Sequence, residues 1–393
     1  MIKMLIGGSP CTYWSIAQKA NREVEAEGLG WELFRNYLIA KEKFKPDFFL
    51  YENNKSAAQA IKDQISRELG VDLMHINSSL VSAQNRQRFY AFNWEVEQPE
   101  DRRILLKDIL ETAFLYGEGD MDPAAVDLQV VGRKKNEEGI YERSWEARID
   151  GKSSALTTVD SRRMVAEPVG VVYQKRNGEE KPVYEVKDRR IKIKSKTYPI
   201  KLPDGLYIIR KLTPIECERL QTLPDNYTAA ISNTQRYKGL GNGWTAEVII
   251  HILKGALKDV PRDEEIVVLS MYDGIGTRRY CLEKMGFTNV TYYAYEIDEP
   301  VMKVALSNYP DIIELGNAFD LRSDDWELGK KLEKEPEQMS NASPSAKTFN
   351  VIQQLKQLAE ERKKLAATHS NNTRFTNDVL AIEYAVSILE AVC

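Results

Sequence analysis

The sequence predicts an α/β protein built on a doubly wound, mixed and mostly parallel sheet, with the two halves of the sheet in permuted order along the chain. Short apolar strands alternate with helical stretches in residues 1–93, which favours a parallel sheet. A glycine-rich turn, residues 272–277, follows the apolar run Ile266–Ser270 and opens a helix. Such a turn normally follows the first strand, but here a cysteine-bearing loop, residues 8–15, precedes it by more than 250 residues. We therefore expect a circular permutation.

The amino-terminal strands and helices are defined by hydrophobic periodicity. Met4–Ile6 is a short apolar strand, and Phe48–Tyr51 is a run typical of a buried strand. Helical spacing is present in Glu32–Lys43 and in Ala57–Leu69. Because strands and helices alternate at this spacing, we expect these strands to pair in parallel.

Residues 113–210 are predicted to form an inserted, mostly β domain. Helical periodicity fades there, and β-rich runs such as Val169–Gln174 and Val183–Val186 take its place. Glycine-centred turns at Asn177-Gly178 and Asp204-Gly205 separate such runs. The change of pattern marks the boundaries of the insert.

A basic stretch within this insert is a candidate binding surface. Its members fall two residues apart, so on a single strand all would project from one face: Arg190, Lys192, Lys194 and Lys196. The formal net charge is −4, with 55 Lys and Arg against 59 Asp and Glu, so no global field draws the chain to nucleic acid. A local basic face suits phosphate groups, although a solvated strand face explains any single lysine equally well.

Helical patterns return after the insert. Thr213–Leu220 and Thr245–Leu257 are predicted helices, and residues 264–320 are a strand-turn-helix-strand run. Asn341–Ser345 is predicted to be a linker before an amphipathic helix and a last helix at Asn377–Val392. We predict five segments: a first core half at 1–112, the insert at 113–210, return helices at 211–260, a second core half at 261–328 and a helical extension at 329–393.

Cysteine, histidine and apolar patterns argue against several classes of protein. Four cysteines lie far apart without a CxxC pair, and three histidines make no metal-ligand spacing, so neither a disulfide framework nor a metal site is supported. No apolar stretch approaches 18 residues, and Met1–Ile6 is too short for the core of a signal peptide. We expect no membrane association and a cytoplasmic protein with reduced thiols.

Cys11 is the candidate nucleophile. It follows a Gly-Gly-Ser-Pro turn at the end of a predicted strand, where catalytic loops of such sheets lie. A thiol needs little activation to attack an electron-poor carbon. Alone, Cys11 is better explained as a buried structural cysteine. Two further elements favour catalysis: Glu52 with two asparagines after the strand Phe48–Tyr51, and the alternate guanidiniums of Arg86 and Arg88.

The second half of the chain carries candidate cofactor residues. The glycine turn consists of Tyr272, Asp273, Gly274, Ile275, Gly276 and Thr277. Glycines there let the backbone approach a ligand closely. Glu296 follows about 20 residues later at the end of the next predicted strand, where an acid can bind ribose hydroxyls. By itself this pattern fits a nicotinamide dinucleotide as well as S-adenosylmethionine.

Together these motifs resemble those of the cytosine-C5 DNA methyltransferases. The resemblance rests on Pro10-Cys11 with Ser15 four residues on, on Glu52-Asn53-Asn54, and on Gln84, Arg86 and Arg88 at alternate positions. It continues in residues 210–225, which resemble the conserved helix after the family's recognition domain, and in Arg236–Trp244, which resembles its last motif. Details such as Ser9, Asp273-Gly274-Ile275 and Trp244 are similar to the animal de novo enzymes.

The resemblance implies a class I S-adenosylmethionine-dependent methyltransferase fold and a DNA (cytosine-5)-methyltransferase acting on double-stranded DNA. Cys11 would add to carbon 6 of a flipped cytosine, and Glu52 would donate a proton to N3. Arg88, helped by Arg86, would steady O2 and the cysteine loop. The β-rich insert would be the target-recognition domain, with the basic stretch on DNA.

The implied cofactor is S-adenosyl-L-methionine. Besides the glycine turn, the residues expected to hold it are Glu296, Ile297, Asn317, Ala318, Asn242, Gly243 and Trp244. The family usually has Asp where this chain has Asn317, and an amide still offers an acceptor, so we expect binding with altered strength.

Two alternatives remain beside methylation of DNA. The same cysteine chemistry serves a tRNA-methylating relative, and a homologue that binds DNA without activity is the second alternative. The size of the insert favours DNA, and the presence of every expected reactive residue favours activity. The resemblance further implies a bacterial or phage restriction-modification setting, in the nucleoid-associated cytoplasm. The helices of residues 329–393 are expected to pack on their own domain or to mediate self-association.

Overall fold

Two units make up the chain, Met1–Ser323 and Asp324–Cys393. The computed structural model describes residues 1–15, 22–111, 126–135, 141–148, 150–156, 163–168, 183–193, 196–200, 202–324 and 326. The helices predicted within residues 329–393 lie outside these ranges, as does the β-rich run Val169–Gln174. The fold is therefore that of the first unit.

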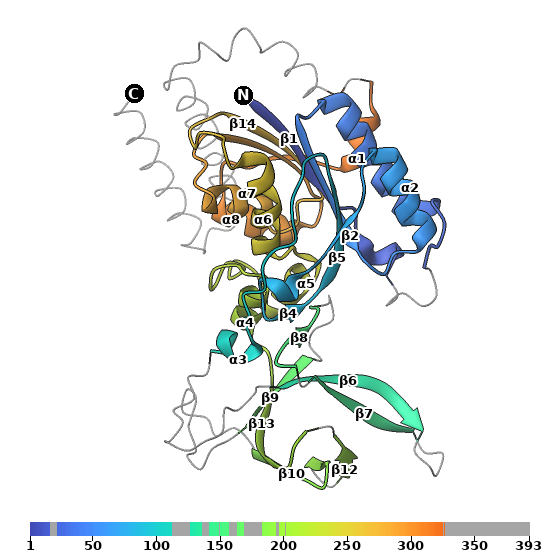
Figure 1. Cartoon of the computed structure of the whole chain (residues 1–393), viewed down its shortest axis with the longest axis vertical. Coiled ribbons are helices and arrows are strands. Elements are labelled where there is room, and N and C mark those ends of the chain that lie inside the picture. The colour runs from blue at the N-terminus through green and yellow to red at the C-terminus, as the bar shows by residue number, and fades with distance from the viewer. Residues whose placement is uncertain are drawn as a thin grey trace, which may run out of the picture. The chain divides into compact units, whose positions relative to one another are not determined.

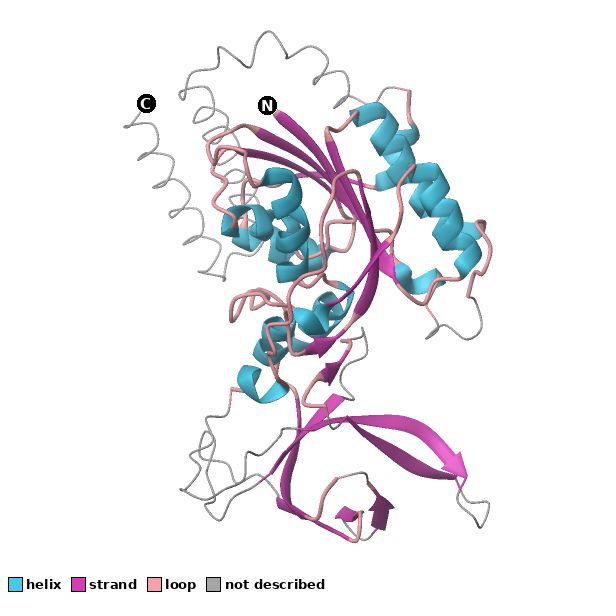
Figure 2. Cartoon of the chain, viewed as in Figure 1, coloured by secondary structure: helices cyan, strands magenta, loops and turns pink. Residues whose placement is uncertain are grey.

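A seven-stranded sheet forms the centre of this unit (Figures 1 and 2). In spatial order its strands are β16 (Ile313–Gly316), β15 (Val290–Tyr295), β14 (Ile266–Met271), β1 (Ile2–Gly7), β2 (Phe48–Asn54), β5 (Gln87–Phe92) and β3 (Met74–Asn77). The strands from β16 to β2 pair in parallel, whereas β5 is antiparallel to both β2 and β3. The predicted mixed, mostly parallel sheet is confirmed.

Helices lie on both sides of this sheet (Figure 1). On one side are α1 (Gly28–Phe44) and α2 (Gln59–Leu69), and on the other are α6 (Ala246–Leu257), α7 (Thr277–Lys284) and α8 (Glu299–Asn308). Successive side chains of a strand enter opposite cores, which is why Met4, Leu5 and Ile6 are all fully buried. Because both faces of such a strand are buried, its sequence is a continuous hydrophobic run rather than an alternation of apolar and polar residues.

Shorter helices complete the unit. They are α3 (Leu106–Ile109), α4 (Pro214–Leu220), α5 (Asn233–Asn242), and the 3₁₀ turns η1 (Cys11–Tyr13), η2 (Ser78–Leu80) and η4 (Ala318–Arg322). Thr213 accepts a hydrogen bond from the backbone of Glu216, whose carboxylate in turn accepts from the backbone of Thr213. This capping box begins α4 at the residue that the sequence predicted.

The topology brings the two halves of the chain together at the switch point of the sheet. From β14 the chain proceeds to β15 and β16 on one side, and from β1 it proceeds to β2 on the other. Ligands of open α/β sheets bind at the carboxyl ends of the strands that flank such a point. The carboxyl end of β14 leads into the glycine turn and that of β1 into the cysteine loop. Two motifs far apart in sequence therefore begin on neighbouring strands.

A second sheet of seven antiparallel strands lies within residues 126–211. Its strands in spatial order are β12 (Lys196–Pro199), β11 (Arg190–Ile193), β10 (Val183–Lys187), β13 (Gly205–Lys211), β9 (Arg163–Pro168), β6 (Val126–Lys135) and β7 (Tyr141–Arg148). Val186, Ile191 and Tyr207 belong to its own small core. Separately, β4 (Gln84–Asn85) pairs in parallel with β8 (Ser153–Ser154).

The prediction that residues 190–196 form one strand is wrong. The segment is a hairpin, in which Ile193 of β11 pairs with Lys196 of β12 and Lys192 pairs with Thr197. Lys194 lies outside the described residues. Basic residues at every second position of the sequence therefore lie on both sides of a chain reversal. Lys196 does not lie on the strand face that Arg190 and Lys192 share. Only these two of the four basic residues are described as exposed on one strand.

Arg210 joins the second sheet to helix α4. At the end of β13 its guanidinium forms ion pairs with Glu167 of β9 and with Glu216 of α4. Both carboxylates are almost fully buried, as is most of the Arg210 side chain. Because removing one partner would leave buried charge without compensation, this triad is expected to fix the strand to the helix.

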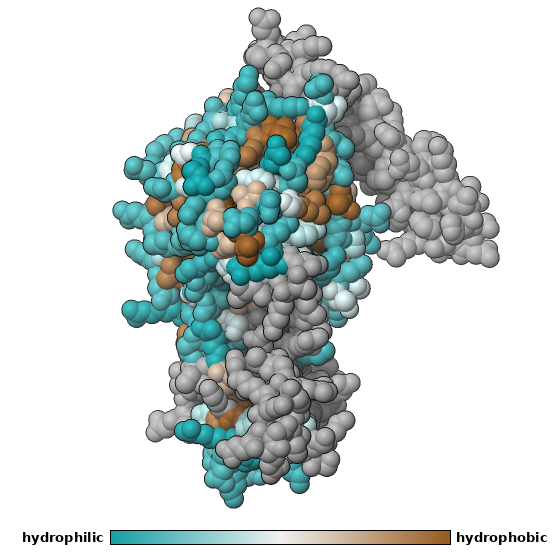
Figure 3. Space-filling model, turned by 90° about the vertical axis from the view of Figure 1, so that its right-hand side faces the viewer, coloured by the Kyte–Doolittle hydropathy of each residue, from teal (hydrophilic) through white to brown (hydrophobic). Residues whose placement is uncertain are grey.

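The described surface is mostly hydrophilic on the face shown in Figure 3, with only small, separate apolar patches. Among the described residues, no helix combines the length and the apolar composition that a membrane span requires. The same residues contain no cluster of three or more His, Cys, Asp or Glu side chains that could hold a metal ion.

Candidate active site

The loop that carries Cys11 is braced by the polar end of β2. Cys11 opens the short turn η1 directly after the Gly-Gly-Ser-Pro segment. Asn53 Nδ2 donates to the carbonyl oxygen of Ser9 at 2.9 Å, and Asn54 Nδ2 donates to that of Cys11 at 3.4 Å. The two asparagines therefore hold the backbone on both sides of Pro10, which explains why they follow Glu52 in the motif.

Gly8 lets the cysteine loop pass close to two other parts of the site. A Cβ atom at this position would lie 2.6 Å from the carbonyl oxygen of Glu52 and 3.0 Å from the ring of Trp244. The first contact is too short for a carbon atom without displacement of the backbone, and the second is tight. Any larger residue would push the loop away from β2 and from Trp244.

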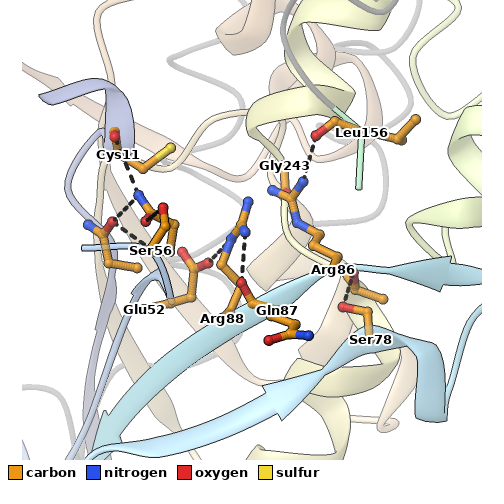
Figure 4. A network of polar contacts seen from close by, with 12 residues as sticks. Cys11, Glu52, Ser56, Ser78, Arg86, Gln87, Arg88, Leu156 and Gly243 are labelled. Carbon is orange, nitrogen blue, oxygen red and sulfur yellow. Dashed lines mark hydrogen bonds and ion pairs between the residues drawn. The ribbon is translucent and has the colours of Figure 1, made fainter. Parts of the chain in front are cut away.

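Glu52 and Arg88 form a largely buried ion pair beside this loop (Figure 4). Arg88 Nε lies 2.8 Å from Glu52 Oε1, and each side chain is no more than 14% exposed. Arg88 sits on β5 opposite Asn54 of β2, so the antiparallel register brings its guanidinium to the end of the strand that carries Glu52. A donor and an acceptor are thereby held together at the edge of the sheet.

Arg86 follows a different course from Arg88 (Figure 4). It lies between β4 and β5 and is 2% exposed, and its side-chain hydrogen bonds go to three backbone carbonyls. Nη1 donates to Leu156 at 3.0 Å, and Nη2 donates to Gly241 at 3.2 Å and to Gly243 at 2.8 Å. Burial, together with the charge of Arg88, lowers the pKa of Arg86. These contacts differ from the predicted role of steadying the cysteine loop.

The glycine turn is held by two acidic side chains. Asp273 is buried, and its Oδ1 accepts hydrogen bonds from the hydroxyls of Ser270 and Tyr292, each at 2.6 Å. Glu296, directly after β15, accepts from the backbone N–H of Gly274 at 2.9 Å and from those of the two residues that follow it. The predicted place of Glu296 at the end of the second strand is confirmed.

Arg278 connects the glycine turn to Trp244. Its Nη1 donates to the carbonyl of Tyr272 at 2.9 Å and lies 3.4 Å from Asp273 Oδ1. Its guanidinium carbon lies 3.9 Å from the centre of the Trp244 ring, a cation–π contact. A positive charge in the first turn of α7 opposes the helix dipole, and the buried carboxylate of Asp273 offsets that cost.

One cavity of about 290 Å³ unites the two halves of the site. Residues of the cysteine loop, of the Glu52–Arg88 pair, of the last motif and of the glycine turn all line it, namely Gly8–Thr12, Glu52, Arg86, Arg88, Lys238, Gly239, Asn242, Gly243, Trp244, Tyr272–Ile275, Thr277, Arg278, Glu296, Asp298 and Val301. Its volume is close to the lower end of the range for small-molecule sites. Most residues that the sequence singled out thus meet in one place.

Four predicted cofactor residues do not line this cavity: Gly276, Ile297, Asn317 and Ala318. Gly276 has φ 76° and caps the start of α7, a left-handed conformation that favours glycine. Ile297 is 69% exposed. The Asn317 side chain accepts a hydrogen bond from the backbone N–H of Phe319 at 3.0 Å and so caps η4.

Several cavity residues were not predicted as site residues from the sequence, among them Lys238, Arg278 and Asp298. Lys238 Nζ lies 2.7 Å from Asp298 Oδ2, which joins α5 to the start of α8 at the rim of the cavity. Each partner is unremarkable in its own segment, so no local pattern identifies the pair. Arg278 could have been identified from the sequence, because a basic residue in the first turn of a predicted helix indicates that an acidic side chain lies nearby.

Glu314 on β16 is a partly buried residue whose two carboxylate oxygens are buried and have no hydrogen-bond partner among the described residues. Burial, and then the charges of Asp273 and Glu296, raise its pKa from 4.5 to about 8. Between these two values the folded protein keeps a proton that the unfolded chain releases, so stability falls as the pH rises through this window.

We therefore expect Glu314→Gln to leave the free energy of unfolding almost unchanged at pH 4 and to raise it at pH 9. The gain in the free energy of unfolding at pH 9 should be about 1–2 kcal/mol. This is less than the free energy that corresponds to the whole pKa shift, because Glu314 is only partly buried. Urea unfolding at both pH values measures the difference. The matched control is Glu42→Gln, at an exposed position on α1, which should show no pH-dependent gain. Equal effects of the two substitutions at pH 9 would contradict the prediction.

Comparison with known proteins adds independent information. The family model for C-5 cytosine-specific DNA methylases matches residues 1–258. The type II methyltransferase M.Sau3AI of Staphylococcus aureus is 23% identical over 317 residues, which cover 63% of this chain and 76% of that enzyme. The type II methyltransferase M1.ScrFI of Lactococcus lactis subsp. cremoris is 26% identical over 279 residues, which cover 65% of this chain and 62% of that enzyme.

A plant protein matches a shorter region. The DNA (cytosine-5)-methyltransferase DRM2 of Oryza sativa subsp. japonica is 29% identical over 113 residues, which cover 29% of this chain and 18% of the rice protein. The family model alone spans well over half of the chain, including Cys11, Glu52, Arg88 and Trp244. The predicted enzyme class, DNA (cytosine-5)-methyltransferase, is confirmed by these matches. The chain belongs to the C-5 cytosine-specific DNA methylase family.

Proposed function

We propose that this protein transfers a methyl group from S-adenosylmethionine to carbon 5 of a flipped cytosine in duplex DNA, with Cys11 as the nucleophile. One observation carries the proposal: a single cavity is lined both by Cys11 with the Glu52–Arg88 pair and by the glycine turn with Glu296. A thiol and a nucleotide-binding turn in one cavity are what a methyl transfer to a base requires.

The cavity wall fits S-adenosylmethionine. Asp273 Oδ2 and Thr277 Oγ1 are buried and have no hydrogen-bond partner among the described residues, although both residues line the cavity. A buried carboxylate oxygen without a partner is costly, and the ammonium group of the cofactor's amino-acid part would satisfy it. Glu296, which lines the cavity directly after β15, would accept from the ribose hydroxyls. When bound, the cofactor supplies an electrophilic methyl group on a sulfonium.

The chain's own groups prepare the base. The Cys11 sulfur forms a bond to carbon 6 of cytosine, and electron density moves toward N3 and O2. Glu52 acts as the general acid that gives a proton to N3, while Arg88 donates hydrogen bonds to O2. Carbon 5 thereby becomes nucleophilic. Once carbon 5 is methylated, loss of its proton to water restores the C5–C6 double bond and expels the thiolate of Cys11, and the proton on N3 returns to Glu52.

The target carbon is inaccessible within a duplex, so the base must leave the stack at a cost of a few kcal/mol. We propose that the second sheet, as the target-recognition domain, offsets this cost through phosphate contacts. The register of the β10–β11 hairpin puts Lys187 opposite Arg190, on the face away from the buried Val186, and Lys192 follows on the same face. These three exposed basic side chains replace the predicted row of four.

We further propose that the chain is a circular permutation within its family. The family match ends at residue 258, before β14 and the glycine turn begin. Yet β14 pairs in parallel with β1 along its whole length, from Ile2 opposite Ile266 to Gly7 opposite Met271. The segment outside the match thus supplies the central strand next to the cysteine strand. The similarity in detail to the animal de novo enzymes stays a prediction.

Tritium transfer from labelled S-adenosylmethionine tests the proposal. We expect label in cytosine-containing duplex DNA and none in a tRNA mixture at the same enzyme concentration. Label in tRNA alone would favour the RNA-methylating alternative. Binding of the cofactor and of DNA without transfer to either substrate would identify an inactive homologue and overturn the proposed reaction.

A further inference from the structure

Arg86 is a buried charge for which the proposed chemistry has no use. Its side chain points away from Cys11 and Glu52, toward Leu156 and Gly243 (Figure 4). All three of its side-chain acceptors are neutral carbonyl oxygens, and no carboxylate among the described residues forms an ion pair with it. A guanidinium taken out of water in this way is retained where its planar set of donors is needed to bridge groups at fixed positions.

Two of the carbonyls that Arg86 binds lie at the carboxyl end of α5. Gly241 belongs to the last turn of this helix and Gly243 is its cap, so their carbonyl oxygens have no partner within the helix. A cation at this end also interacts favourably with the helix dipole. Arg86 therefore acts as the cap of α5, supplied from the link between β4 and β5, more than 150 residues away in sequence.

The same helix end forms a wall of the cavity. Asn242, Gly243 and Trp244 line it, and Trp244 stacks on Arg278 of the glycine half while lying close to Gly8 of the cysteine loop. A shift of this turn would move Trp244 relative to both halves of the site. The shape of the cofactor pocket therefore depends on the position of this turn.

The third carbonyl, that of Leu156, anchors Arg86 to residues 153–156, which consist of β8 and the two residues after it and are called the β8 segment below. Leu156 donates its N–H to Gln84 Oε1 at 2.8 Å and accepts from Arg86 at its carbonyl oxygen. Gln84 and its neighbour pair in parallel with β8. Leu156 is therefore held at both of its backbone polar groups by residues on either side of Asn85. This gives Arg86 a fixed support opposite the α5 end.

Gln221 supports the turn from the other side. Its Nε2 donates to the carbonyl of Leu240 at 2.6 Å and to that of Gly243 at 3.2 Å, and it is fully buried. Gly243 thus accepts from both Arg86 and Gln221. Two buried side chains share the task of holding one turn, which allows their effects to be tested separately.

We infer that Arg86 is a positioning residue, which holds the Gly241–Trp244 turn against the β8 segment and so sets the affinity for the cofactor. This inference rests on the proposed function, because it assigns the cavity to S-adenosylmethionine. It differs from a direct role of Arg86 at O2 of the cytosine, which would act on the rate of the chemical step rather than on cofactor affinity.

The test separates cofactor affinity from the rate of transfer. For Arg86→Gln we expect the Kd of S-adenosylhomocysteine, measured by calorimetry, to rise about tenfold or more. At saturating S-adenosylmethionine, kcat should stay within about threefold of the wild-type value. Arg88→Gln should show the opposite pattern, with a lower kcat and a nearly unchanged Kd. The matched control is Arg102→Gln, at a half-exposed position paired with Glu247, which should alter neither quantity.

Gln221→Met provides a second variant in case Arg86→Gln does not fold. It removes the donors to Leu240 and Gly243 and should raise the same Kd by a smaller factor. An unchanged Kd in whichever of these variants folds would overturn the inference. A wild-type protein that does not bind S-adenosylhomocysteine would instead overturn the proposed function, so the two failures are distinguishable.

Discussion

Cys11→Ser is expected to abolish methyl transfer, with a loss of about 10⁴-fold or more. A serine hydroxyl is far less acidic than a thiol and a much weaker nucleophile, so addition to carbon 6 should not occur at a measurable rate. The direct measurement is covalent trapping on duplex DNA that contains 5-fluorocytosine. Fluorine at carbon 5 cannot leave as a proton does, so an active nucleophile stays attached to the base. The wild-type protein should form this adduct and the variant should not.

The variant should keep its structure and its cofactor affinity, because the loop is held through groups that the substitution leaves in place. Asn54 binds the carbonyl oxygen of Cys11, and Asn53 binds that of Ser9, so neither contact uses the sulfur. The matched control is Cys217→Ala, a buried cysteine of α4, which should still form the adduct. Adduct formation by Cys11→Ser at the wild-type level would remove Cys11 from the mechanism.

The strands and their polar ends were predictable from the sequence, whereas their order was not. Phe48–Tyr51 and Ile266–Ser270 are continuous apolar runs because both faces of β2 and β14 are covered. The same runs say nothing about which strands are neighbours, since pairing is decided by contacts between distant segments. The order of the motifs suggested a permutation, but the pairing of β1 with β14 is known only from the structure.

The spacing of two residues did not predict a shared strand face where the chain changes direction between the two residues. Arg86 and Arg88 would share a face on one strand, but β4 ends before Arg86 and β5 begins after it, so the two guanidiniums diverge. The break between Lys192 and Lys196 is similar, because the residues between β11 and β12 include no glycine or proline to mark a reversal. Alternation identifies a face only while one strand continues.

Glu52 is the second residue on which the proposed chemistry depends, and its ion pair complicates any substitution. Glu52→Ala removes the proton donor and also leaves Arg88, which is 14% exposed in its side chain, without its carboxylate. A loss of activity in that variant would therefore mix two effects. Glu52→Gln is the better change, because the amide keeps the shape and a hydrogen-bond donor but cannot transfer a proton to N3.

We expect Glu52→Gln to lower kcat by about 10²–10⁴-fold, the usual range for a lost general acid, while the Kd of S-adenosylhomocysteine stays within about threefold. Single-turnover transfer to duplex DNA at saturating cofactor measures the chemical step. A double-mutant cycle with Arg88→Met then isolates the ion pair: if the two residues act on one developing charge, the double variant should be much less impaired than the product of the single effects. The matched control is Glu68→Gln on the exposed face of α2. A kcat for Glu52→Gln near the wild-type value would show that the proton reaches N3 from another source, and Glu52 would then serve only to orient Arg88.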